Sequence, residues 1–239
     1  MLDIPFRGLW GNRQIRKKDH IQIGKHRIGH FRFLLFAIVL MFALRPFLEG
    51  YVNIGLLTDI FFFLILLSGA YAFSYQRRTF LVVLFIAVPT LLLGVTSHFL
   101  ASEPIEIAKR IGIALFLGYV LVIILSHIFR EKEVTEDLIT GAVCAYLLIG
   151  MLWTFVFYFL ELAHEGSFAH SNQALHDIGA FLYFSFVTLT TLGYGDVVPL
   201  TGPARSLAIL EAVMGQLYLA ITIARLVGVH ASQPRSRKQ

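Results

Sequence analysis

Residues 190–196 decide how this chain is interpreted, and they read Thr190-Thr191-Leu192-Gly193-Tyr194-Gly195-Asp196. Two glycines stand at alternate positions, and the run follows an apolar, aromatic stretch, Ile178 to Leu189, that is too short to cross a bilayer. This combination predicts a half-helix that ends in a loop. Consecutive carbonyls can point the same way along one axis when alternate residues take a positive φ, which glycine does at little steric cost. The run therefore predicts a row of backbone carbonyl oxygens.

Such a row has a use inside a membrane, where a small cation that loses its water needs a substitute shell of oxygens. The run TLGYGD resembles the selectivity filter of potassium channels, with Leu192 where valine is commoner. The resemblance implies an ion-binding filter at Thr191, Leu192, Gly193, Tyr194 and Gly195. Of these, the first four residues would hold K+.

The resemblance extends back into a pore helix at residues 178–190. It implies a supporting role for five residues around the filter: Asp196, Tyr183, Phe184, Thr188 and Thr190. The aromatic pair among them would brace the filter tyrosine, and the aspartate would sit at the outer mouth and orient the filter through hydrogen bonding to the pore-helix aromatics. A simple glycine turn between two membrane helices is the alternative. It is disfavoured because the threonines, the tyrosine, the aspartate and the half-helix all agree.

Composition places the whole chain in a membrane. It has 239 residues, of which 57% are hydrophobic, 14% aromatic and 15% charged, and its mean hydropathy is +0.73. The net charge is +5, but eight of the twenty Lys and Arg lie between Arg7 and Arg32, just before the first apolar run. We expect this segment to contact anionic lipid rather than nucleic acid; a solvated tail is the alternative. The single cysteine, Cys144, lies in an apolar run and is expected to be buried.

The fold class is predicted to be all-α integral membrane, with six transmembrane helices plus a re-entrant pore helix and filter loop. Six apolar stretches are long enough to span: 31–48, 54–75, 79–100, 111–129, 138–160 and 201–229. The domains follow as a basic cytoplasmic segment (1–30), a four-helix membrane domain (31–130), a cytoplasmic connector (131–137), a pore domain (138–229) and a short cytoplasmic tail (230–239). Within the pore domain, the filter is 191–196 and the inner helix 203–229.

The four-helix domain lacks the charges of a voltage sensor. Its fourth span, Ile111 to Phe129, contains no Lys, Arg, Asp or Glu, and residues 101–110 are expected to form a polar connection before it. Asp59 is expected to interact with the dipole at the start of the second helix. At the connector, Thr135 is expected to cap the fifth helix.

The inner helix leaves two questions open. If Gly215 aligns with the inner-helix glycine of potassium channels, it is either a gating hinge or a close-packing position. Its alignment would place Gln216, Leu219 and Ile223 on the cavity. A competing stripe at helical spacing contains Glu211, Tyr218, Thr222 and Arg225. Within that stripe, Glu211 is either a hydrogen-bonded brace behind the filter or an ion-facing group.

The function expected from the resemblance is passive, potassium-selective conduction without strong voltage gating. One filter loop cannot enclose an ion, so a homotetramer is expected, with no cofactor besides the permeant K+. The alternatives are a potassium transporter subunit or a regulatory channel-like subunit that does not conduct alone. A catalytic protein is disfavoured because His164, His170 and His176 lack metal-ligand spacing. Basic residues place both termini in the cytoplasm, and the plasma (inner) membrane is the expected location.

Overall fold

The computed structural model of this chain describes residues 30–48, 54–72, 77–100, 102–131, 133–170, 173–174 and 177–232. The basic N-terminal segment with its expected lipid contact lies almost entirely outside these residues, as do His176 and the end of the C-terminal tail.

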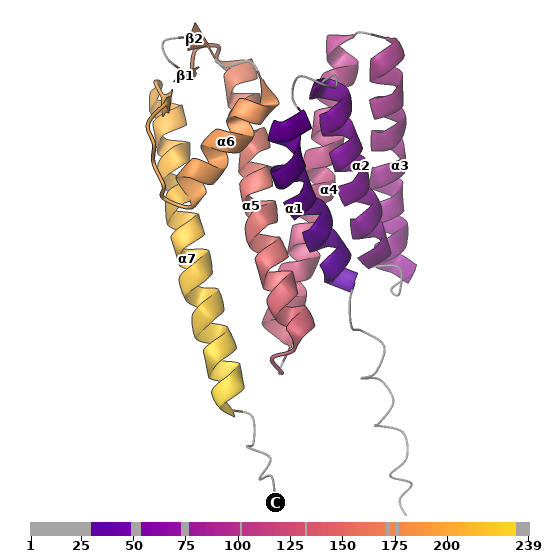
Figure 1. Cartoon of the computed structure of the whole chain (residues 1–239), viewed down its shortest axis with the longest axis vertical. Coiled ribbons are helices and arrows are strands. Elements are labelled where there is room, and N and C mark those ends of the chain that lie inside the picture. Colours follow the sequence, from indigo (N-terminus) through magenta and orange to yellow (C-terminus); the bar gives the residue numbers. More distant parts are fainter. Residues whose placement is uncertain are drawn as a thin grey trace, which may run out of the picture.

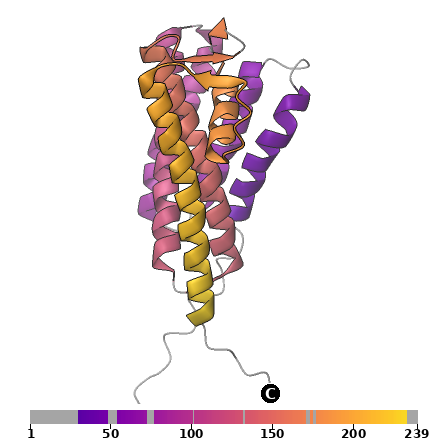
Figure 2. The same ribbon diagram turned by 90° about the vertical axis from the view of Figure 1, so that its left-hand side faces the viewer.

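The described residues form helices, with three short strands near one end of the molecule (Figure 1). The helices are α1 (His30–Leu48), α2 (Ile54–Ala72), α3 (Arg77–Phe99), α4 (Glu103–Arg130), α5 (Glu136–Ala163), α6 (Ile178–Leu189) and α7 (Gly202–Ser232). The strands are β1 (Phe168–His170), β2 (Gln173–Ala174) and β3 (Val197–Pro199). Figures 1 and 2 show the short α6 inclined beside α5 and α7, near the end of the molecule that carries the strands. The half-helix predicted from the sequence is therefore present.

Four helices of the described residues are long and apolar enough to cross a membrane: α3, α4, α5 and α7. The helices α1 and α2 have 19 residues each. Their apolar segments, Phe31–Leu44 and Asp59–Gly69, are shorter. The all-α class of a multi-pass membrane protein is thus confirmed, while a crossing by all six predicted spans stays a prediction.

The expected polar connection at residues 101–110 is wrong, because α4 begins at Glu103. Proline is tolerated in a first helical turn, and the acids Glu103 and Glu106 are favourable beside the positive end of the helix dipole. The charges of this turn also pair with one another at helical spacing. Glu106 lies 2.7 Å from the Lys109 ammonium and 3.1 Å from the Arg110 guanidinium.

The helix α5 lies in the middle of the fold and packs against α1 and α4 as well as α6 and α7. Its start is capped as the sequence predicted: the Thr135 side chain accepts from the Leu138 N–H at 3.2 Å. Further along, α5 and α6 approach closely at Gly150, where an added Cβ would lie 2.7 Å from the ring of Phe186. Cys144 is buried and free, as expected.

A small sheet with the strand order β2-β1-β3 joins the end of α5 to the segment that follows residues 190–196. Strand β1 is antiparallel to β3, with Phe168 opposite Pro199. The buried carboxylate of Glu161, near the end of α5, accepts from the N–H of Gly166 at 2.7 Å and of Phe168 at 3.0 Å. The sheet and this carboxylate together hold the exit of the run against α5.

Candidate functional site

The run after α6 has an alternating backbone conformation. φ is +59° at Thr191, +63° at Gly193 and +78° at Gly195. The positive φ predicted for the two glycines is therefore confirmed, and Thr191 extends the alternation to a third position. A positive φ is uncommon for a residue with a side chain, so this conformation needs support from its surroundings.

Backbone hydrogen bonds to the end of α6 provide that support. The N–H of Thr191 donates to the carbonyl oxygen of Thr188 at 2.9 Å. The N–H groups of Leu192 and Gly193 both donate to the carbonyl oxygen of Val187, at 2.9 and 3.2 Å. These bonds satisfy carbonyls at a helix end that lack partners within the helix. Within the described residues, no hydrogen bond ends on the carbonyl oxygens of 191–195, which are free to bind a ligand.

The run is also open on one side. Every residue from 190 to 196 is exposed in the single chain. The side chain of Tyr194 is 68% exposed and that of Leu192 is 55% exposed. The Thr190 hydroxyl turns back instead and donates to the Phe186 carbonyl oxygen at 2.6 Å. Large exposed apolar side chains next to unbonded carbonyls form a surface that one chain leaves uncovered.

The two aromatic residues predicted to support the run have different places. Tyr183 donates its hydroxyl proton to Asp196 at 2.7 Å, so it ties α6 to the end of the run. Phe184 is buried and packs edge-on against Phe157 and Phe168, with ring centroids 5.0 and 5.3 Å apart. Successive residues of a helix point about 100° apart. Phe184 therefore belongs to the core behind α6. Unlike Tyr183, it has no hydrogen bond to the run.

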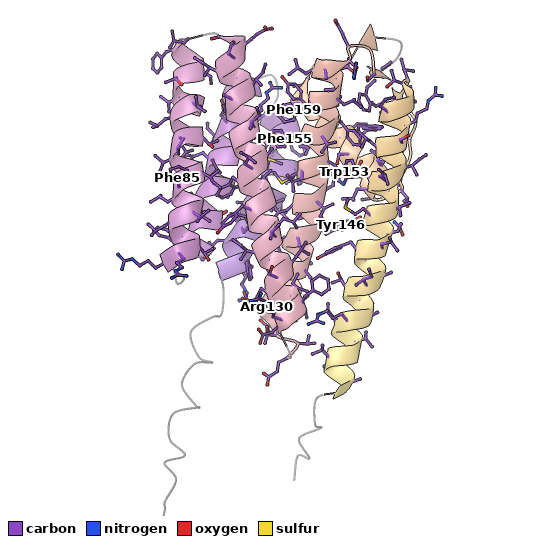
Figure 3. All side chains as sticks on the ribbon, turned by 180° about the vertical axis from the view of Figure 1, so that it is seen from behind. Phe85, Arg130, Tyr146, Trp153, Phe155 and Phe159 are labelled. Atoms are coloured by element: carbon purple, nitrogen blue, oxygen red, sulfur yellow. The ribbon has the colours of Figure 1, made fainter. Side chains whose placement is uncertain are left out.

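The end of α6 is packed between α5 and α7. The Tyr146 hydroxyl of α5 donates to the carbonyl oxygen of Leu189 at 3.4 Å, and Figure 3 shows this tyrosine on the side of α5 that faces α7. From the other side, a Cβ added to Gly215 would lie 2.5 Å from the same oxygen. Gly215 is therefore a position of close packing, one of its two readings; a hinge at this residue stays a prediction.

The predicted inner helix corresponds to α7, and one of its faces packs against other helices of the same chain. Glu211 is fully buried, Thr222 is 8% exposed, and Tyr218 donates to the Ala142 carbonyl oxygen of α5 at 2.7 Å. The face predicted to line the cavity consists of Gln216, Leu219 and Ile223 and is open in the single chain, as is Val227 one turn further along α7. The stripe that competed for the cavity thus packs against α4, α5 and α6, which leaves the second face for other contacts.

Nearer the C-terminal end of α7, Arg225 is hydrogen-bonded to the end of α4. Its guanidinium donates to the carbonyl oxygens of Ile128 at 2.9 Å, Phe129 at 2.6 Å and Glu131 at 3.1 Å. The last carbonyls of a helix lack helical partners and carry the negative end of the dipole. Arg225 therefore joins the inner helix to the four-helix part of the chain.

Glu211 lies behind α6. Its Oε1 atom is 2.5 Å from the Ser185 hydroxyl, which in turn lies 2.7 Å from the carbonyl oxygen of Gly150 on α5. The three helices α5, α6 and α7 therefore meet at one buried polar contact. This geometry matches the expected brace behind the run rather than a group on its open side.

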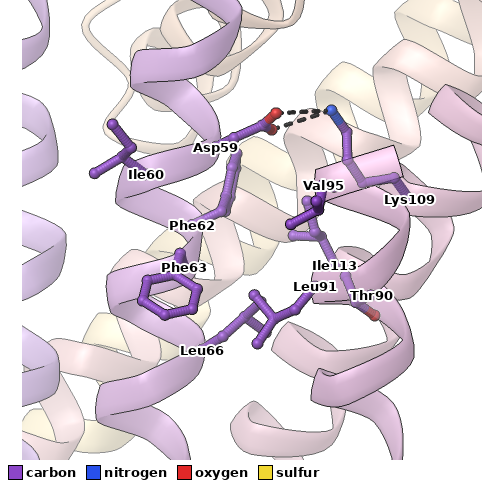
Figure 4. Close-up of a pocket in the computed structure, with 11 residues that line it drawn as sticks. Asp59, Ile60, Phe62, Phe63, Leu66, Thr90, Leu91, Val95, Lys109 and Ile113 are labelled. Atoms are coloured by element: carbon purple, nitrogen blue, oxygen red, sulfur yellow. Dashed lines mark hydrogen bonds and ion pairs between the residues drawn. The ribbon is translucent and has the colours of Figure 1, made fainter. Parts of the chain in front are cut away.

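A second polar group lies between α2, α3 and α4, beside an apolar pocket of about 230 Å³ (Figure 4). The Lys109 ammonium is 3.1 Å from both carboxylate oxygens of Asp59. The sequence analysis expected Asp59 to interact with a helix dipole and did not identify Lys109 as its partner, because residues 101–110 were not assigned to α4. The neighbouring Arg110 stacks on the ring of Tyr158 in α5, 4.1 Å from its centroid.

Sequence reasoning did not single out Ser185, Tyr146, Glu161 or Lys109, although each is a polar residue in or beside an apolar stretch. That signal could have marked them, since a polar group in such a stretch needs a partner. In the part of the chain that the structure describes, no group of His, Cys, Asp and Glu could hold a metal ion.

Comparisons with known proteins agree with this geometry. Residues 145–230 match the family described as "Ion channel". The chain is 31% identical over 101 residues to "Two pore potassium channel a" of Oryza sativa subsp. japonica, covering 42% of this chain and 26% of that protein. It is 35% identical over 83 residues to "Two pore potassium channel c" of the same rice, covering 35% of this chain and 17% of that protein. The chain therefore spans about a quarter or less of the length of these two relatives.

A third relative is matched along most of its length. "Protein LctB" of Bacillus caldotenax is 30% identical over 125 residues, which cover 47% of this chain and 92% of that protein. Residues 145–230, which the family model matches, contain the alternating run, the half-helix and nearly all of α7, the features that carry the resemblance to potassium channels. The recognition made from the sequence is confirmed: the chain belongs to the ion channel family, together with potassium channels, and is a channel protein rather than an enzyme.

Proposed function

We propose that this chain is the subunit of a passive, potassium-selective channel whose ion pathway is the TLGYGD run. The observation that carries the proposal is the alternation of positive φ at Thr191, Gly193 and Gly195, with the first three amides of the run bonded back to the end of α6. A backbone with this alternation can direct successive carbonyl oxygens to one side. Rings of such oxygens replace the hydration shell of K+.

The ligands in this proposal are the carbonyl oxygens of Thr191, Leu192, Gly193 and Tyr194, with the Thr191 hydroxyl at the inner end. Gly195 supplies the conformation that turns the chain outward. Asp196 stands at the outer mouth, where its bond to Tyr183 fixes the end of the filter. The C-terminal end of α6 adds a partial negative charge beside the cation path.

The working unit in this proposal is a homotetramer. One chain provides carbonyls on one side of an ion only, and cyclic symmetry supplies the remaining sides. The exposure of Tyr194 and Leu192 supports this, because neighbouring copies would cover them. Gln216, Leu219 and Ile223 then line the cavity below the filter, with Val227 nearer the cytoplasmic mouth, since the opposite stripe of α7 is occupied within the subunit.

The four-helix part is proposed to be a scaffold with little voltage sensitivity. Moving one charge across 100 mV contributes about 2.3 kcal/mol, so steep gating needs several mobile charges. The segment 111–129 has no Lys, Arg, Asp or Glu. Lys109 is buried beside two carboxylates, which fixes it in place. Open probability should therefore change only shallowly with potential.

In a cell, the protein would lie in the plasma (inner) membrane with both termini in the cytoplasm. The positive-inside rule supports this orientation, since the basic N-terminal segment, Arg77-Arg78 and the basic tail fall on one side when six helices span. The filter would then open to the outside. The N-terminal basic segment would contact anionic lipid headgroups on the cytoplasmic side.

Two other functions remain as outcomes of the test: a potassium transporter subunit, and a regulatory subunit that does not conduct alone. The test is ion flux into liposomes that contain the purified full-length chain, driven by a potassium or a sodium gradient. We expect rapid potassium flux, little sodium flux, and loss of this preference in Gly195→Ala, because a Cβ disfavours φ of +78°. Absence of passive flux down a gradient would favour the transporter subunit or the regulatory subunit, and equal flux of both ions would reject the proposed filter.

A further inference from the structure

We infer that Glu211 is a neutral positioning residue that donates a hydrogen bond to Ser185 and so locks α7, α6 and α5 together behind the filter. Its effect on conduction rests on the proposed function. Its protonation does not, because that follows from the arrangement of oxygens around one serine hydroxyl.

The Ser185 hydroxyl has two close oxygen neighbours. The carbonyl oxygen of Gly150 is 2.7 Å away and Oε1 of Glu211 is 2.5 Å away. A hydroxyl has one proton to donate, and neither a carbonyl nor an ionised carboxylate has a proton to return. Both contacts can be hydrogen bonds only if Glu211 supplies the second proton. The order of donation is then from Glu211 to Ser185 and from Ser185 to Gly150.

The Gly150 carbonyl is suited to the end of this chain of bonds. Besides its place in the backbone ladder of α5, this oxygen lies 2.7 Å from the Ser185 hydroxyl and 3.0 Å from the Thr154 hydroxyl. The glycine also lets α6 approach closely, since a Cβ at this position would meet the ring of Phe186 at 2.7 Å. The acceptor is therefore fixed by the backbone of α5.

The surroundings of Glu211 argue for the same state. The residue is fully buried, and its Oε2 atom has no hydrogen-bond partner among the residues that the structure describes. Ser185 from α6 is hydrogen-bonded to it, and Tyr146 from α5 is a titratable group close enough to interact with it electrostatically. Across the described ranges, no Lys, Arg or His forms an ion pair with it. A carboxylate buried without a cation is costly inside a membrane, whereas a neutral carboxyl group is much less so.

The position of this bond gives it a consequence at the filter. Glu211 and Gly215 are one turn apart on α7, and their partners on α6, Ser185 and Leu189, are also one turn apart. The two helices therefore touch along one full turn that ends where the filter begins. Loss of the contact between Glu211 and Ser185 should let the end of α6 shift, which would loosen the carbonyl geometry of the run.

The first test is infrared spectroscopy of the purified full-length chain in lipid vesicles near neutral pH. We expect the wild type to show the carbonyl stretch of a protonated carboxyl group, and Glu211→Gln to lack it. The control is Glu103→Gln, a change of an exposed glutamate, which should keep the band. The inference is overturned if the wild type has no such band or if Glu211→Gln retains it.

The second test is the potassium-to-sodium flux ratio of the same vesicles. Glu211→Gln keeps a donor for Ser185 and should keep the wild-type ratio. Glu211→Leu and Ser185→Ala lose the bond and should lower the ratio by roughly two- to tenfold, the range of one net hydrogen bond. Ser126→Ala, an exposed serine of α4, is the matched control and should change nothing.

These outcomes separate the two proposals. If the wild type passes sodium and potassium equally, the proposed filter is rejected, while the infrared result still decides the state of Glu211. If the wild type is selective and Ser185→Ala is equally selective, the positioning role is rejected. Should Glu211→Leu fail to assemble, the spectra of wild type and Glu211→Gln decide the inference without it.

Discussion

The two faces of the inner helix α7 contrast in how they are satisfied. On one face, Glu211, Tyr218 and Arg225 each make hydrogen bonds to other helices of the same chain. On the other, Leu219, Ile223 and Val227 are 36%, 58% and 62% exposed. Both faces share one helix and one membrane depth, so the difference lies in their partners.

This contrast separates what one chain can complete from what it cannot. Buried polar groups need hydrogen bonds wherever they lie, and the first face finds them within the subunit. Apolar side chains need no hydrogen-bond partner. The second face can therefore be covered by lipid or by a neighbouring copy, or it can line a cavity. The polar stripe of a membrane helix therefore need not mark its water-facing side.

The largest effect on potassium flux is expected from Gly215→Ala. This change adds a side chain at the closest contact of the α7 face that packs within the subunit. The added Cβ would lie 2.5 Å from the Leu189 carbonyl oxygen, and overpacking of this kind costs about 1–3 kcal/mol in each subunit. We expect loss of potassium flux and a lower melting temperature. Gly228→Ala is the matched control, because a Cβ there meets no atom within 4 Å. Tolerance of Gly215→Ala would show that the contact is slack.

Cysteine substitutions should distinguish the two faces by their access to water. In a Cys144→Ser background, a charged thiol reagent on the cytoplasmic side should block most of the current of Leu219→Cys and Ile223→Cys. Thr222→Cys, which replaces a residue that is 8% exposed, should be unaffected. Faster modification of Thr222→Cys than of Ile223→Cys would reverse the assignment of the faces.

A smaller effect on potassium flux is expected from Arg225→Gln, which releases the inner helix from the end of α4, far from the filter. Hydrogen bonds to charged groups contribute about 1.5–3 kcal/mol, and the guanidinium makes three here. We expect a lower melting temperature and altered open probability with unchanged ion selectivity. Arg225→Lys keeps the charge but loses the planar fork and should be intermediate. Selectivity loss in Arg225→Gln would mean that this contact acts on the filter itself.

The smallest effect on potassium flux is expected from Tyr218→Phe, which removes one hydroxyl from the α7 face that packs within the subunit. Its bond to the Ala142 carbonyl oxygen is 2.7 Å long, and one such bond contributes about 1 kcal/mol. The ring of Tyr218 would still stack on Tyr146, whose centroid is 5.9 Å away. A small drop in melting temperature with normal potassium flux is expected. A complete loss of flux would assign the hydroxyl a role beyond packing.

Local chemistry was sufficient to predict part of this architecture. The positive φ at Gly193 and Gly195 followed from the steric freedom of glycine, and the half-helix followed from an apolar stretch too short to span. The cap at Thr135 was also readable, because a hydroxyl before a helix has one preferred partner. These features depend on residues that are neighbours in sequence.

Contacts between distant residues could not be read in the same way. Lys109 is 50 residues from its partner Asp59, and its helix was expected to start later because charges were treated as marks of a loop. The face of α7 that packs inward depends on Ser185, Ala142 and the end of α4, which are brought together only by the fold. Helical spacing identified both stripes of α7, but it contains no information on which one finds partners.

A bi-ionic reversal potential measures whether the TLGYGD run selects potassium. The purified full-length chain would be recorded in a planar bilayer with potassium on one side and sodium on the other. We predict that potassium permeability exceeds sodium permeability by at least about tenfold, equivalent to 1.4 kcal/mol of discrimination. A reversal potential near zero, with the two ions equally permeant, would show that the run does not select potassium.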